Sequence, residues 1–203
     1  MKYTSATFIK PPRAETAISG TLFPFYEKRG WIAQYKKNGT NSIIAVSPDK
    51  KLTAWTRHGE PHKQWNFTEG SRAIFNRLPE GWHVINAELI HSKTPTIKDT
   101  HYIHDILVTN GKYLIGLTYA QRYKILQDLF LHNPLASMPS HFVLDKHSWL
   151  VKNVRENFGN AFKSINTVED EGLVLKDPTG ILSLQNNSSW LVKARKPHKN
   201  YSF

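Results

Sequence analysis

The chain has 203 residues, enough for one domain of ordinary size or two small ones, and its 39% hydrophobic and 12% aromatic residues exclude a disordered chain. Lys and Arg number 27 against 16 Asp and Glu. The resulting formal net charge of +11 favours a polyanionic partner, nucleic acid or nucleotide phosphate, because neutralised phosphates release counterions. The sequence contains no cysteine, which excludes disulfides, zinc–thiolate sites and cysteine nucleophiles.

The chain shows no sign of secretion or membrane insertion. Residues 1–5 lack an apolar signal core, and no apolar run approaches the length of a membrane span. We therefore expect a cytoplasmic protein with no membrane partner, and the sequence leaves its protein partners open.

Apolar runs separated by turn residues predict strands through the first half of the chain. These strands are expected over residues 31–35, 42–46, 51–56, 82–89, 102–108 and 112–115. Turns are predicted at residues 48–50 and at Asn110-Gly111, a pair typical of hairpins. Residues 72–78 are expected to form a short helix.

The second half begins with a stronger helix prediction over residues 118–130. Thr118 and Gln121 have the spacing of a capping box, and apolar residues recur at three- and four-residue steps. The spacing of Leu150, Val154 and Phe158 predicts a second helix. Strands are expected over residues 172–176, 181–184 and 190–193, with a turn at 177–180. Mostly antiparallel strands with helices outside them predict an α+β fold.

Lys36 is a candidate nucleophile because it precedes Asn38-Gly39, where glycine lets a nucleotide approach the backbone. Such a segment is often only a hairpin turn with a solvated lysine. A free lysine has a pKa near ~10.4, so a reactive Lys36 needs burial or nearby positive charge. Lys37, Arg57, Lys193 or a bound metal ion could supply that charge.

Two further stretches end strands with polar groups. Arg57, in Arg57-His58-Gly59, offers a planar fork to phosphate or ribose oxygens, although most such arginines are merely exposed. Glu88 ends an apolar strand, where it could form a turn, accept a ribose hydroxyl or hold a metal ion.

His104-Asp105 lies inside a predicted strand. The ring of His104 could cover a purine, or it could be a structural histidine. No other histidine has a spacing from His104 that is typical of zinc sites, so zinc is set aside.

The last stretches place charges on neighbouring strands. Glu171 precedes a strand that ends in Lys176, and Lys193 and Arg195 share one face of the final strand, where they could flank a phosphate. The alternative for these residues is edge-strand charge that discourages aggregation.

Taken together, the stretches resemble the motifs of the covalent nucleotidyltransferase superfamily, which contains ATP-dependent DNA ligases, RNA ligases and mRNA capping enzymes. Order and spacing agree across residues 31–196, and residues 171–176 match in every specified position. The matching stretches are Lys36-Lys37-Asn38-Gly39, Arg57-His58-Gly59, Glu88, His104-Asp105, Glu171-Gly172-Leu173-Val174-Leu175-Lys176 and Lys193-Ala194-Arg195.

The resemblance implies two antiparallel sheets flanked by helices, with ATP between them, in a single nucleotidyltransferase domain over residues 1–203 that ends in a short basic tail. It implies a ligase that joins 5′-phosphate and 3′-hydroxyl ends of RNA or of a nicked duplex through a lysyl-AMP intermediate, with ATP as AMP donor and Mg²⁺ or Mn²⁺ as metal. The implied catalytic residues are Lys36, Glu171 and Lys193. The implied nucleotide-binding residues are Lys36, Asn41, Arg57, Glu88, His104, Lys176, Lys193 and Arg195, and the implied metal ligands are Glu171 and Glu88.

Three departures from the family pattern bear on the substrate. Position 104 is His, where the family usually has Phe or Tyr. Position 41 is Asn, typical of RNA-editing and phage nick-sealing RNA ligases, whereas DNA ligases and capping enzymes usually have Arg. The chain also leaves no room for an OB-fold domain after Arg195. These features favour an RNA ligase, with a minimal DNA ligase or a non-catalytic nucleic-acid-binding relative as alternatives.

Overall fold

The computed structural model describes residues 1–63, 65–165, 168–183 and 188–197. Its elements, in chain order, are β1 (Thr16–Ala17), the short 3-10 helix η1 (Gly20–Leu22), α1 (Phe23–Lys28), β2 (Ile32–Lys37), β3 (Thr40–Val46), β4 (Leu52–Thr56), α2 (Glu69–Asn76), β5 (His83–Ile90), β6 (Thr100–Thr109), β7 (Lys112–Tyr113), α3 (Tyr119–Phe130), β8 (Ala136–Ser137), β9 (His141–Asp145), β10 (Ser148–Val151), α4 (Phe158–Lys163), β11 (Asp170–Lys176) and β12 (Leu191–Arg195). Among these residues, no helix is long and apolar enough to cross a membrane.

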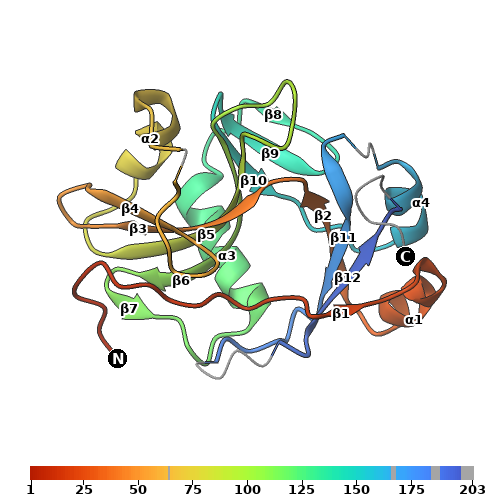
Figure 1. Ribbon diagram of the computed structural model, residues 1–203. Coiled ribbons are helices and arrows are strands. Elements are labelled where there is room, and N and C mark those ends of the chain that lie inside the picture. Colours follow the sequence, from red (N-terminus) through yellow and green to blue (C-terminus); the bar gives the residue numbers. More distant parts are fainter. Residues whose placement is uncertain (64, 166–167, 184–187, 198–203) are drawn as a thin grey trace.

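The strands form two sheets, which Figure 1 shows beside each other. The larger sheet has the order β4-β3-β5-β6-β10-β9-β8, with β7 paired to β6, and the smaller sheet has the order β1-β12-β11-β2. Most neighbours are antiparallel, as expected, but β6 and β10 pair in parallel, and so do β1 and β12. The α+β fold with two sheets and few helices is thus confirmed.

The buried apolar residues form two clusters, and the larger one also includes Ile32 of β2 and Leu191 of β12 from the smaller sheet. The larger cluster includes the fully buried Phe75 of α2 and Tyr119 and Leu126 of α3, packed on the larger sheet. The smaller cluster joins Phe23 of α1 and Phe158 of α4 to the smaller sheet. Alternate residues of the smaller sheet, such as Ile32 and Ala33, therefore pack into different clusters.

The chain passes from one sheet to the other beside the candidate nucleophile. Strand β2 ends at Lys37 in the smaller sheet, and β3 begins at Thr40 in the larger sheet. Asn38 and Gly39 make the crossing. Residues at the end of β2 and the start of β3 consequently face the space between the sheets from opposite sides.

Most predicted elements are present. The capping box of Thr118 and Gln121 starts α3 as expected, and Asn110 and Gly111 both have positive φ in the hairpin turn between β6 and β7. The predicted strand over residues 112–115 is shorter, with only Lys112–Tyr113 in β7.

Two expectations about secondary structure are wrong. Residues 150–158 do not form a helix: Leu150 and Val151 belong to β10, and α4 begins only at Phe158. The apparent helical spacing is coincidental, because β10 is buried beside β6 and successive apolar residues are both covered. In the predicted strand at 181–184, Ile181 makes a single bridge to Thr118, and Leu184 lies outside the described residues.

Candidate active site

A cavity of about 310 Å³ lies between the two sheets, and all nine predicted site residues line it. The smaller sheet contributes the cations and carboxylate of β2, β11 and β12, and the larger sheet and its loops contribute the rest. These residues are Lys36, Asn41, Arg57, Glu88, His104, Glu171, Lys176, Lys193 and Arg195. The structure brings them together, and the role of each stays a prediction.

Lys36 forms an ion pair with Glu171 in the wall of the cavity. The Nζ of Lys36 is 2.5 Å from Oε2 of Glu171, and Nη2 of Arg195 is 3.3 Å from the same oxygen. The contact arises because β11 lies between β2 and β12, with Gly172 opposite both Lys36 and Arg195. The Lys36 ammonium must leave this ion pair and lose a proton before its nitrogen can attack an electrophile.

Two glycines make this arrangement sterically possible. Gly39 has no room for a side chain, since a Cβ atom would lie 2.6 Å from both Cγ of Glu88 and the carbonyl oxygen of Leu89. Gly172 has a φ of +153°, and its Cβ would lie 1.9 Å from the carbonyl oxygen of Ala194. Glycine is therefore required at both positions for reasons of space.

His104 presents a neutral ring to the cavity. Burial, helped by the positive charge of Lys176, lowers the pKa of His104 to about 3. Burial also lowers the pKa of Lys176 to about 7, and its Nζ lies 3.4 Å from the carbonyl oxygen of His104 and 4.2 Å from the ring centroid of Tyr119. A flat, uncharged ring beside aromatic and aliphatic groups suits a purine base.

Asp105 supports this wall without being available to a ligand. Its carboxylate takes two hydrogen bonds from the buried Arg122, from Nε at 2.9 Å and from Nη2 at 3.0 Å. Burial alone would raise the pKa of Asp105, but the Arg122 guanidinium holds it below its ordinary value. The pair fixes α3 to β6 behind His104.

Gln34, which the sequence motifs did not single out, also lines the cavity. Its Nε2 donates hydrogen bonds to the hydroxyl of Tyr119 and to Oδ1 of Asn153, and the Tyr119 hydroxyl donates to the carbonyl oxygen of His104. The signal was available, because Gln34 and Lys36 are two residues apart in a strand and share a face.

Asn41 and Glu88 are opposite each other on β3 and β5. The Nδ2 of Asn41 donates to Oδ1 of Asn86 at 2.8 Å and to the carbonyl oxygen of Ala87 at 3.2 Å, which fixes its orientation. Burial raises the pKa of Glu88, and the charges of Lys36 and Lys93 oppose that shift.

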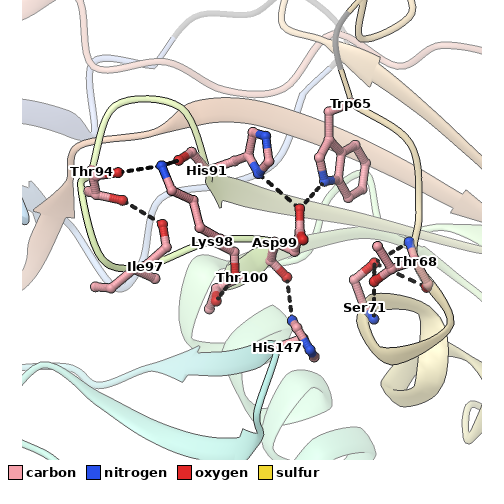
Figure 2. A network of polar contacts seen from close by, with 10 residues as sticks. All are labelled: Trp65, Thr68, Ser71, His91, Thr94, Ile97, Lys98, Asp99, Thr100 and His147. Carbon is pink, nitrogen blue, oxygen red and sulfur yellow. Dashed lines mark hydrogen bonds and ion pairs between the residues drawn. The ribbon is translucent and has the colours of Figure 1, made fainter.

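Lys93, also missed, reaches the cavity from the loop between β5 and β6. Its Nζ donates to the carbonyl oxygen of Gly39. Figure 2 shows how the loop is held: Oδ1 of Asp99 accepts from Nε1 of Trp65 at 2.9 Å and lies 2.9 Å from Nδ1 of His91. Lys98 donates to the carbonyl oxygens of His91 and Thr94. The loop therefore presents Lys93 from a fixed position.

Lys193 is tied to the N-terminal segment. Its Nζ donates to the carbonyl oxygens of Ala14 and Glu15, each at 3.0 Å. Burial, together with the charge of Arg195, lowers the pKa of Lys193. An ammonium has three donors, so one remains for a phosphate oxygen.

Glu88 and Glu171 fit a divalent cation only in part. The charge of Glu171 is one of the influences that raise the pKa of Glu88, so the two carboxylates are near enough to interact. No group of three or more His, Asp or Glu suited to a metal ion occurs among the described residues. Mg²⁺ commonly binds one or two carboxylates together with substrate phosphates, so the residues fit a metal that arrives with a nucleotide.

Comparison with solved structures defines the class of fold. Mycobacterial DNA ligase D complexed with ATP and MES superposes with a TM-score of 0.60 at 14% identity, over 94% of this chain and 60% of that one. An archaeal ATP-dependent RNA ligase gives a TM-score of 0.51 at 16% identity, over 91% of this chain and 48% of that one. The fold is that of the adenylation domains of ATP-dependent polynucleotide ligases.

The family follows from sequence. Residues 83–195 match the model of the ATP dependent DNA ligase domain, so the chain belongs to that family. A 95-residue stretch is 27% identical to DNA ligase 4 of Yarrowia lipolytica (strain CLIB 122 / E 150), covering 46% of this chain and 10% of that protein. The chain thus spans about a tenth of that curated relative, and 60% of the mycobacterial structure.

Proposed function

We propose that the chain transfers AMP from ATP to Lys36 and uses it to join a 5′-phosphate end to a 3′-hydroxyl end. The Nζ of Lys36 attacks the α-phosphorus, and the bond to pyrophosphate breaks. An oxygen of the 5′-phosphate then attacks the same phosphorus and releases Lys36. Finally the 3′-hydroxyl attacks the 5′-phosphorus and expels AMP.

The ion pair between Lys36 and Glu171 carries this proposal. It supplies a nucleophilic nitrogen, a carboxylate and the adjacent cation Arg195 at one point in a cavity of nucleotide size. Phosphoryl transfer depends mainly on positioning and charge neutralisation, which such an arrangement provides.

Each wall of the cavity has a proposed role. His104 covers the adenine, Glu88 accepts a ribose hydroxyl, and Arg57 binds ribose or phosphate oxygens. Lys193 and Arg195 neutralise the α-phosphate, while Asn41 and Lys176 line the nucleotide site. Glu171 and Glu88 would hold Mg²⁺ or Mn²⁺, which would supply charge neutralisation at the phosphates.

A nick in duplex DNA is the first candidate substrate, because the matching family is described as a DNA ligase domain and the curated relative is a DNA ligase. RNA is the second candidate, favoured by Asn41 at a position where DNA ligases usually have Arg. The RNA ligase predicted from the sequence remains in this second place.

Incubation with α-labelled ATP or GTP, followed by denaturing electrophoresis and peptide mapping, tests the first step. We expect label from ATP on Lys36 and its loss in Lys36→Ala, whereas the exposed-site control Lys28→Ala keeps it. Label on another residue, or none with the intact chain, contradicts the proposal. Nicked DNA and nicked RNA of one sequence, compared under identical conditions, then identify the strand that is sealed.

A further inference from the structure

The N-terminal segment, residues 8–17, extends from the larger sheet to the smaller one. At one end Phe8 packs edge-on against Trp55 of β4, with ring centroids 6.3 Å apart. At the other end β1 pairs in parallel with β12. Figure 1 shows this red segment passing from the side of the larger sheet to β1 beside the smaller sheet. The segment thereby borders the cavity between the sheets.

The segment is held in place by more than its ends. Pro11 is buried and is followed by Pro12, and two consecutive prolines restrict the backbone strongly. The amide of Arg13 donates to Oγ of Ser188 at 3.1 Å, and the two carbonyls that follow accept the bonds from Lys193. The position of this segment is therefore linked directly to Lys193, a residue predicted to bind the α-phosphate.

Lys10 and Arg13 line the cavity from this segment, although neither belongs to a family motif. Both residues are exposed: the Arg13 side chain is 54% exposed, whereas those of Lys36 and Glu171 are 21% and 13% exposed. In an in-line displacement, the leaving group departs on the side of the phosphorus opposite to the attacking nitrogen. Because Lys36 is less exposed than Arg13, we expect the leaving pyrophosphate to face the more exposed side of the cavity, where Lys10 and Arg13 lie.

We propose that Lys10 and Arg13 bind the β- and γ-phosphates of ATP, and the pyrophosphate that leaves, as a subsite separate from the motif residues. This inference rests on the proposed function. The bond that breaks joins the α-phosphorus to the bridging oxygen, whose negative charge passes to pyrophosphate. In the reverse reaction a pyrophosphate oxygen attacks the α-phosphorus of lysyl-AMP and restores ATP and the free lysine.

The electrostatics of the cavity suit a polyphosphate. Leaving out Lys37 and Asp105, whose charges Asp170 and Arg122 compensate, eight of its described lining residues are Lys or Arg and two are Glu. Arg13 pairs only loosely with Glu15, at 3.4 Å between exposed side chains. Exposed pairs of this kind contribute little, so phosphate oxygens can replace the carboxylate with bidentate hydrogen bonds.

Arg13→Ala and Lys10→Ala test the subsite in two measurements on the full chain. The first is the affinity for α,β-methylene-ATP, which cannot transfer its AMP group, compared with the affinity for AMP. We expect each variant to weaken binding of the ATP analogue by about fivefold, equivalent to one hydrogen bond, and to leave AMP binding within about twofold. Lys28→Ala, an exposed cation outside the cavity, should change neither affinity.

The second measurement is kinetic. We expect each variant to raise the KM for ATP in lysyl-AMP formation, and to raise by the same factor the pyrophosphate concentration that half-maximally reverses it. Glu15→Gln should lower both, because it removes the competing carboxylate. Sealing of a pre-adenylylated nick, which involves no pyrophosphate, should be unchanged.

Different failures have different meanings. Unchanged affinity for the ATP analogue, or equal losses for the analogue and AMP, would overturn the subsite. A loss confined to nick sealing would overturn it in favour of a contact with nucleic acid. Absence of lysyl-AMP in the unaltered chain would instead overturn the proposed function, while the binding comparison would still report on the subsite.

Discussion

The adjacent lysines Lys36 and Lys37 at the end of β2 differ in exposure and in their carboxylate partners. Both line the cavity, but the side chain of Lys37 is only 2% exposed and its Nζ lies 3.0 Å from Oδ1 of Asp170. The Lys37 ammonium also lies 5.7 Å from the ring of Tyr102 and 5.6 Å from that of Trp149. The sequence suggested that Lys37 could supply free positive charge beside the nucleophile, but Asp170 compensates that charge.

We predict that Lys37→Ala destabilises the fold, because it leaves the Asp170 carboxylate buried without its partner. The free energy of unfolding should fall by about 3–5 kcal/mol, as for other broken buried pairs, and Lys37→Met combined with Asp170→Leu should recover most of it. Urea unfolding of the three proteins measures both effects. A cost below about 1 kcal/mol for Lys37→Ala would mean that the pair is not buried in solution.

The neutral ring of His104 leads to a prediction about ATP binding. Because its lowered pKa keeps the ring neutral at pH 7, the ring acts as a flat surface and not as a charge. His104→Phe should therefore keep or improve the KM for ATP in lysyl-AMP formation. His104→Ala should raise that KM at least about fivefold, the loss of one stacking contact. Equal KM values for the two variants would mean that the adenine of ATP does not stack on the side chain at position 104.

The register of β11 with its two neighbouring strands brings Lys36, Glu171 and Arg195 together. Glu171 lies in the bulge between Asp170 and Gly172, and Gly172 is paired with both neighbouring strands. The position of Glu171 relative to Lys36 thus depends on a glycine that contacts neither substrate nor metal in the proposed mechanism.

We predict that Gly172→Ala disrupts this register. The added methyl group would overlap the carbonyl oxygen of Ala194 and occupy an unfavourable φ, so both the unfolding free energy and lysyl-AMP formation should fall. Gly159→Ala, in α4, is the matched control: beyond its chain neighbours and its own helix backbone, no described heavy atom lies within 4 Å of the added carbon, so it should be neutral or mildly stabilising. Thermal unfolding and labelling of both variants measure the difference; similar behaviour would contradict the register argument.

Alternation and turn residues predicted most strands and α3 because those elements are specified by local patterns. The motifs also predicted which residues meet in the cavity, because their order along the chain carries topological information. The hairpin of β9 and β10 was missed, since β10 is covered by β6, a strand more than thirty residues earlier in the sequence. Lys10 and Arg13 gave no local signal, because their place depends on long-range pairing of β1 with β12.

Several histidines of the molecule are buried in the neutral state. Burial lowers the pKa of His101 to about 3 and that of His141 to about 4. His101 sits among Trp65, Phe67 and Phe75, and neither of its ring nitrogens has a hydrogen-bond partner among the described residues.

These histidines predict acid sensitivity. Between about pH 6.5 and 4 the unfolded chain binds protons that the folded chain does not, so stability falls as pH falls, by up to about 1.4 kcal/mol per pH unit for each such group. Urea midpoints at pH 7.5 and 5 should show the loss. His101→Leu should reduce the difference, whereas His58→Gln, at an exposed position, should leave it; an identical pH difference in all three proteins would contradict this account.

Strand β1 also protects the protein against self-association, because it covers a sheet edge. Its two residues cover the outer edge of β12 and occupy backbone groups of the strand that carries Lys193 and Arg195. An uncovered sheet edge is a template for pairing with another chain. Protein from which residues 1–17 have been removed should therefore expose this edge of β12, and its tendency to form oligomers should increase with concentration.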